Sequence, residues 1–171
     1  DFYLGQQFST RDYQREGLYK NGIYETNSFG KSEKVTFENF GFKGGFNFKI
    51  SGKQLVTFNA AHLTKAPSLR STFPNSRLNN SIVNGLESEN INSTDISYIY
   101  RSPKLKGRLT AYYSLLKNTT QISFFYAEGI FDDGAGYLNT DAFVSQTLTK
   151  LNKKNIGAEL SLEYQLSSTF K

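Results

Sequence analysis

The sequence of 171 residues contains no cysteine, which excludes disulfide bonds and thiolate metal sites within it. It also lacks methionine and tryptophan, and it has one histidine and three prolines. No apolar run approaches the ~20 residues that a membrane-spanning helix needs. There is also no basic and apolar leader that ends in a small-residue cleavage site. We therefore expect neither a transmembrane helix nor a signal peptide in these residues.

Aromatic residues are abundant although hydrophobic residues are few overall. Hydrophobic residues make up 37% of the sequence, against roughly 45–50% apolar residues in typical globular chains. The sequence nevertheless contains 15 Phe and 11 Tyr. This combination is typical of strands with one apolar face. It is also typical of transmembrane barrels, in which only every second residue meets lipid.

Residues 40–50 and 155–166 alternate most clearly between apolar and polar side chains. Successive side chains of a strand point to opposite faces of the sheet. Each stretch therefore predicts a strand with one face toward lipid and the other toward water. The predicted lipid-facing residues are Phe40, Phe42, Phe46, Phe48, Ile50, Ile156, Leu160, Leu162 and Tyr164.

The whole sequence divides into six expected strands. They cover residues 2–14, 35–50, 54–64, 91–101, 105–126 and 139–166. The apolar phase changes between Phe37 and Phe40, which predicts a bulge near Glu38 and Asn39. The 54–64 stretch is apolar at both odd and even positions, so its facing stays open.

The expected connections alternate between long and short. Residues 15–34, 65–90 and 127–138 form the long ones, and residues 51–53 and 102–104 form tight turns. This asymmetry is typical of outer-membrane barrels, whose long loops lie outside the cell. Six strands are fewer than the roughly eight of the smallest such barrels, and an open edge in lipid costs several kcal/mol per unpaired group. We therefore expect an all-β, antiparallel segment of a larger transmembrane barrel.

Three short segments match the pattern of one protein family. Residues 63–70 resemble its (F)RAPSL-E-L segment, with Lys65 in place of the usual Arg. Residues 84–93 resemble its NPNLKPE-S segment, with Gly85 and Ser88 in place of the two prolines, and residues 155–160 resemble its A-x-x-GVEL strand. The matching positions are Lys65, Ala66, Pro67, Ser68, Leu69, Asn84, Leu86, Glu89, Gly157 and Glu159. In these segments the chain resembles TonB-dependent outer-membrane receptors, and the Bacteroidota branch in particular.

The resemblance implies a protein of the Gram-negative outer membrane with a barrel of the roughly 22-stranded type. It implies uptake of a scarce or large nutrient such as a siderophore, cobalamin, peptide or glycan. TonB, ExbB and ExbD would power this uptake through an N-terminal plug domain. We expect residues 1–171 to belong to one barrel domain of a longer protein, with the plug and the closing C-terminal strands outside this sequence. A surface lipoprotein is a further partner that the resemblance leaves open.

The residues that could carry other chemistry are isolated. His62 is the only histidine, so it has no cysteine or second histidine to work with. Glu159 and Glu163 lie roughly 13 Å apart at ~3.3 Å per residue, too far for one metal ion or a glycosidase pair. The dispersed Lys and Arg form no nucleic-acid-binding stripe. We expect no enzymatic activity, no metal or cofactor site, and no nucleic-acid binding.

Aromatic and basic residues in or beside the expected long loops are candidates for ligand contact. They are Tyr19, Tyr24, Phe73, Arg77, Tyr126 and Phe131. The alternative is that these side chains only pack one loop against another. Two other functions stay open. One is a structural or adhesive outer-membrane barrel without active transport, and the other is a soluble β-sandwich or lipid-binding barrel.

Overall fold

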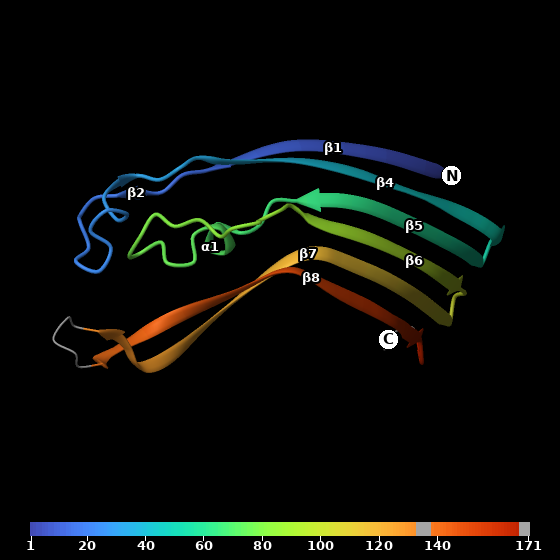
Figure 1. Cartoon of the computed structure of the whole chain (residues 1–171). Coiled ribbons are helices and arrows are strands. Elements are labelled where there is room, and N and C mark those ends of the chain that lie inside the picture. Colours follow the sequence, from blue (N-terminus) through green and yellow to red (C-terminus); the bar gives the residue numbers. More distant parts are fainter. Residues whose placement is uncertain (133–137, 168–171) are drawn as a thin grey trace.

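Six long strands lie side by side in one curved sheet, in the order of the chain (Figure 1). The computed structural model describes the backbone of residues 1–132 and 138–167, and the side chains of residues 1–128 and 144–167. The long strands are β1 (Phe2–Tyr13), β4 (Val35–Ser51), β5 (Gln54–Lys65), β6 (Glu89–Arg101), β7 (Leu105–Asp132) and β8 (Leu138–Tyr164). The short elements are β2 (Glu16–Gly17), which pairs with β3 (Gly30–Lys31), and the helix α1 (Leu69–Thr72).

Every long strand runs antiparallel to its neighbour, which confirms the predicted all-β, antiparallel fold. Tight turns join β4 to β5 and β6 to β7 at one end of the sheet, and long segments join the strands at the other end (Figure 1). The described part of the chain holds no helix that is long and apolar enough to cross a membrane.

Two details of the predicted layout are wrong. β1 and β4 pair without interruption from Phe2–Phe46 to Tyr13–Val35, so no bulge lies near Glu38 and Asn39. The apolar residues simply change faces there. The predicted loop at residues 127–138 is also too long, because β7 continues to Asp132 and pairs with β8. The rest of that loop, residues 133–137, lies outside the described residues.

The register sorts the side chains into two faces, because residues directly opposite each other in a sheet point to the same side. Phe46 of β4 lies opposite Phe58 of β5, which in turn lies opposite Ile96 of β6. This resolves the facing of β5. The apolar face contains Phe2, Leu4, Phe8, Phe40, Phe42, Phe46, Phe48, Val56, Phe58, Ala60, Ile96, Tyr98, Leu105, Leu109, Ala111, Tyr113, Ile156, Ala158, Leu160, Leu162 and Tyr164.

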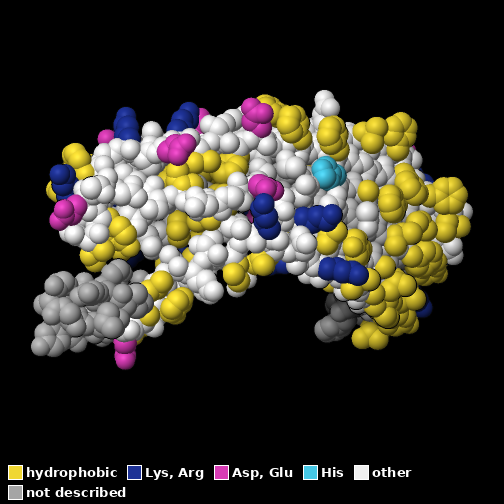
Figure 2. Space-filling view, in the orientation of Figure 1, with side chains coloured by type: hydrophobic (Ala, Val, Ile, Leu, Met, Phe, Trp, Pro, Cys, Tyr) yellow, Lys and Arg dark blue, Asp and Glu magenta, His cyan; other side chains and the backbone are white. Residues whose placement is uncertain are grey.

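The polar face lies on the other side of the same strands. Its members include Tyr3, Gln7, Lys43, Asn47, Lys49, Asn59, Asp95, Ser97, Lys106, Arg108, Thr110, Tyr112, Glu159, Ser161 and Glu163. On the opposite, apolar side, which Figure 2 shows, hydrophobic side chains gather toward the turn end of the sheet and charged side chains lie nearer the loop end.

The sheet covers no hydrophobic core. Within the described residues, the buried apolar side chains are few, namely those of Phe37, Ala66, Pro67 and Phe73. The nine predicted lipid-facing residues are instead between 48% and 74% exposed. A soluble sandwich would bury such a face against a second sheet, and the described chain provides no second sheet large enough.

Candidate functional site

A chain of hydrogen bonds crosses four strands on the polar face. The Tyr3 hydroxyl of β1 donates to Asn59 Oδ1 of β5 at 3.0 Å, and Asn59 Nδ2 donates to Asp95 Oδ2 of β6 at 2.8 Å. Gly45 of β4 lies between Tyr3 and Asn59. A Cβ atom there would lie 2.6 Å from Asn59 Oδ1 and 2.8 Å from Tyr3 Cε1. Because Gly45 has no side chain, the hydrogen bond from Tyr3 to Asn59 can pass over β4.

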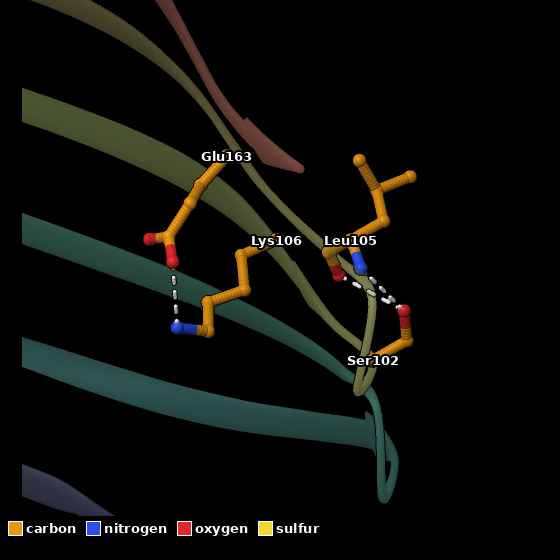
Figure 3. Close-up of polar contacts among 4 residues, drawn as sticks. All are labelled: Ser102, Leu105, Lys106 and Glu163. Carbon is orange, nitrogen blue, oxygen red and sulfur yellow. Dashed lines mark hydrogen bonds and ion pairs between the residues drawn. The ribbon is translucent and has the colours of Figure 1, made fainter. Parts of the chain in front are cut away.

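A second polar cluster joins β6, β7 and β8 nearer the turn end. Arg108 donates from Nη2 to Ser97 Oγ at 3.3 Å and from Nε to Thr110 Oγ1 at 3.2 Å. Lys106 and Glu163 form an ion pair at 3.1 Å across β7 and β8 (Figure 3). The polar face is thus held together by bonds between side chains of neighbouring strands.

Tyr112 and Gly157 lie opposite each other on the same face. A Cβ atom on Gly157 would lie 2.5 Å from the Tyr112 Oη and 2.6 Å from Cζ. The ring therefore covers the glycine, a known device for strengthening a sheet at such a position. This contact explains why glycine occupies position 157, one of the positions that match the family pattern.

Arg15 ties together the two long segments at the loop end, residues 14–34 and 66–88. Its Nε donates to Ser76 O, and its Nη1 donates to Ser28 O at 3.0 Å and to Asn80 Oδ1. Between the same segments, Asn80 N donates to Asn27 O at 2.7 Å. The two segments therefore form one cross-linked unit.

The second of these segments reaches across the end of the sheet. The Tyr13 hydroxyl of β1 donates to Pro67 O at 3.0 Å. Tyr13 lies on the polar face, and the centre of its ring is 5.9 Å from the centre of the Phe37 ring. Farther along, Asn75 Nδ2 donates to Ser145 Oγ of β8 at 3.2 Å. The segment thus joins the first strand of the sheet to the last.

A groove of about 570 Å³ lies between these two segments, and we call it the loop groove. Its lining is mainly amides and hydroxyls, with one half-exposed aromatic ring and one charge of each sign. The lining residues are Thr26, Asn27, Phe29, Lys31, Ser32, Glu33, Asn80, Ser81, Ile82 and Asn84. Phe29 is 60% exposed. Such a lining can hydrogen-bond a polar ligand and stack against one of its flat surfaces.

The five candidate ligand-contact residues whose side chains are described do not line the loop groove. Tyr19 is 83% exposed, Arg77 and Tyr126 are also exposed, and Tyr24 is half-buried. Phe73 is only 1% exposed, so its ring is buried and not available at the surface. The side chain of Phe131 lies outside the described residues.

Most groove residues escaped the sequence analysis. The sequence hinted at the groove only through the Asn, Ser and Thr residues at 26–28 and 79–81. Many loops have this composition, so it does not indicate a groove by itself. The groove arises only because Arg15 and Asn27 bring these distant stretches together.

The other family-pattern residues lie around the loop end. Lys65 ends β5 and pairs with Glu89 at the start of β6. Ser68 caps α1 by accepting a hydrogen bond from Ser71 N at 3.0 Å. Gly85 has φ +68, which proline cannot adopt, so the first proline of the pattern would not fit the backbone of this chain at position 85. The remaining positions are Ala66 and Pro67, both buried, exposed Leu69, half-buried Leu86, Asn84 in the loop groove, and Gly157 and Glu159 on the polar face.

The titratable groups of the described residues do not gather into a set that could hold a metal ion. They include no cluster of three or more His, Asp or Glu side chains. His62 lies on the apolar side of β5, with its Nδ1 2.7 Å from Asn92 Oδ1. Asp12 lies beyond the apolar residues of β1, where hydrogen bonds from Lys34 and Thr36 lower the pKa of its carboxyl.

The sheet is similar to part of a solved structure, the copper transporter OprC, an outer-membrane barrel protein. The match has a TM-score of 0.58 and 16% identity, and it covers 98% of this chain and 25% of that one. The chain therefore spans about a quarter of the length of that protein. At this identity the likeness shows the fold alone. No protein-family model matches the chain, and no curated protein matches its sequence.

Proposed function

We propose that this chain forms part of the wall of a TonB-dependent transport receptor in the bacterial outer membrane. The observation that carries the proposal is the division of six long strands into an exposed apolar face and a hydrogen-bonded polar face. A membrane barrel needs this division, because alternate residues meet lipid and the water-filled interior. The likeness to OprC supports the barrel fold.

The two outer strands of the sheet extend the proposal to the rest of the protein. β1 and β8 each have a long neighbour on one side only within the described residues. In lipid, every backbone group of such an edge must find a partner. We therefore expect further strands of the same protein beside β1 and β8, and a plug domain against the polar face. TonB, ExbB and ExbD would act on that plug, and a surface lipoprotein could cover the loop end.

The loop groove is our candidate for the first contact with cargo. Its side chains suit a polar ligand rather than a soft metal ion, which prefers sulfur or imidazole ligands. This segment has no Cys or Met, and its one histidine lies on the apolar side of the sheet. We therefore do not propose copper, the cargo in the name of OprC, as the cargo that this segment contacts.

The proposal is tested in the bacterium with the complete protein. Growth on a panel of single nutrient sources is compared among the wild type, a deletion of this gene and a deletion of tonB. Both deletions should lose growth on the same nutrient, and the protein should fractionate with the outer membrane. Normal growth of the gene deletion on every nutrient would favour a structural or adhesive barrel. Extraction without detergent would favour a soluble fold.

The groove is tested by a matched pair of substitutions in one loop. Phe29→Ala removes the exposed ring of the groove, whereas Tyr19→Ala removes an exposed ring outside it. We expect Phe29→Ala to lower uptake of the identified nutrient by about 2- to 12-fold, the range of one lost stacking contact. Tyr19→Ala should leave uptake within about twofold of wild type. The reverse result would move the cargo site to the residues that the sequence analysis favoured.

A further inference from the structure

Two lysines lie on the apolar side of the sheet, at the end of its hydrophobic residues. The β6–β7 register places Lys117 opposite Asn90, on the same side as Tyr113 and Leu115. The β7–β8 register places Lys154 opposite Leu115, two residues before Lys117. Diagonal neighbours on one face of a sheet lie about 7–8 Å apart. The β7–β8 register shifts between Leu116 and Thr119, and the Lys154 ammonium lies over the Tyr113 ring, so the two flexible side chains would have to turn toward each other to share one anionic group.

Hydrophobic side chains border this lysine pair toward the turn end. Lys154 Nζ lies 5.6 Å from the centre of the Tyr113 ring, and Ile156, the next residue of β8 on this side, is 74% exposed. Figure 2 shows Lys and Arg side chains where the field of hydrophobic side chains ends. Lysines at such a boundary keep their stems on apolar surface and their charges at the level of lipid headgroups.

The neighbouring carboxylates do not neutralise the pair. Glu87 is bound to Lys150 at 3.2 Å and accepts a hydrogen bond from Asn118 at 3.1 Å. Glu89 points to the polar face. Neither Lys117 nor Lys154 forms an ion pair with any described residue. The boundary therefore carries two uncompensated positive charges directly above an apolar surface.

We propose that Lys117 and Lys154 bind the phosphorylated, anionic headgroup of a membrane lipid, whose acyl chains lie along Ile156 and its apolar neighbours. The charge and the adjoining apolar surface match the two parts of such a lipid. This inference rests on the proposed function, because it requires the apolar face to meet the bilayer. Long loops lie on the outer side of outer-membrane barrels, so the lipid belongs to the outer leaflet.

The test uses the complete barrel purified in detergent and titrated with diphosphoryl lipid A, with retained lipid counted by native mass spectrometry. Phosphatidylcholine, which has a phosphate but no net charge, is the control lipid. A lysine near an anionic lipid surface strengthens binding roughly fivefold. The double variant Lys117→Gln/Lys154→Gln should therefore bind lipid A about 25-fold more weakly than the wild type.

Two single substitutions are the matched controls. Lys150→Gln removes a lysine already paired with Glu87, and Lys153→Gln removes one that the register places on the polar face. Both should bind lipid A within about twofold of the wild type. Equal binding by the double variant and the wild type would overturn the inference, as would equal loss in the controls or equal binding of phosphatidylcholine.

Outer-membrane fractionation of the same proteins separates the two proposals. If the wild type inserts but the lysines do not matter, only the lipid site fails. If the wild type does not insert, the proposed function and the lipid site fail together.

Discussion

The two faces of the sheet are built from alternate residues of the same strands, yet they are stabilised differently. On the polar face, side chains of neighbouring strands bond to one another, as in the chain from Tyr3 through Asn59 to Asp95. On the apolar face, side chains of neighbouring strands meet in ring pairs such as Phe46 and Phe58, whose ring centres lie 5.4 Å apart. The polar face thus supplies its own partners, whereas the apolar face depends on what surrounds it.

Among the predicted effects, a positive charge placed on each face should give the largest difference in unfolding free energy between the two faces. Phe46→Arg puts a cation on the apolar face, and Asn47→Arg puts the same cation one residue away on the polar face. We expect Phe46→Arg to cost about 2–4 kcal/mol of unfolding free energy in lipid vesicles, since an arginine in the bilayer loses its hydration. Asn47→Arg should cost less than about 1 kcal/mol because its side chain faces water. Equal costs, measured by urea unfolding of the complete barrel, would contradict the assignment of faces.

Glycines on the two faces offer a second, smaller contrast. Gly157→Val on the polar face would displace the Tyr112 ring that covers it, and we expect overpacking to cost about 1–3 kcal/mol. Gly107→Val on the apolar face would meet only the flexible end of Leu162, at 3.1 Å from the Cβ position. It should cost less than about 0.5 kcal/mol in the same vesicle assay. A larger loss from Gly107→Val would show that the apolar face is packed against protein.

The ion pair between Lys106 and Glu163 should have the smallest effect. Both side chains are about half exposed, at 52% and 48%, so water and salt screen their attraction. We expect Lys106→Ala to lower the unfolding free energy by less than about 1 kcal/mol, and by still less in 1 M salt. A cost that is large and independent of salt would mean that the polar face excludes water at this point.

The sequence predicted the strands and most of the faces well, because a local period of two is enough to define both. It failed where the period carried no information. β5 is apolar at odd and even positions, since Leu55 and Leu63 lie on the polar face while Val56 and Phe58 lie on the apolar face. The phase change near Phe37 suggested a bulge, but Phe37 instead packs against Tyr13 on the polar face.

The sequence also misjudged the loops for a physical reason. Phe73 was a candidate ligand contact, whereas its side chain is buried in the folded chain. The sequence predicted a loop at residues 127–138, yet pairing with β8 extends β7 to Asp132. In both cases contacts across the fold outweigh local composition.

The amino-acid sequence by itself determined that the chain forms long antiparallel strands and which residues within each strand share a face. Strand geometry sets both properties over a few neighbouring residues. Only the tertiary structure decided which alternate residues of β5 lie on the apolar face and which lie on the polar face. It also decided how Arg15 joins two loops into a groove, and that Lys117 and Lys154 lie on neighbouring strands of one face. These features depend on the register between strands and on contacts between distant residues. The local pattern of a sequence contains neither.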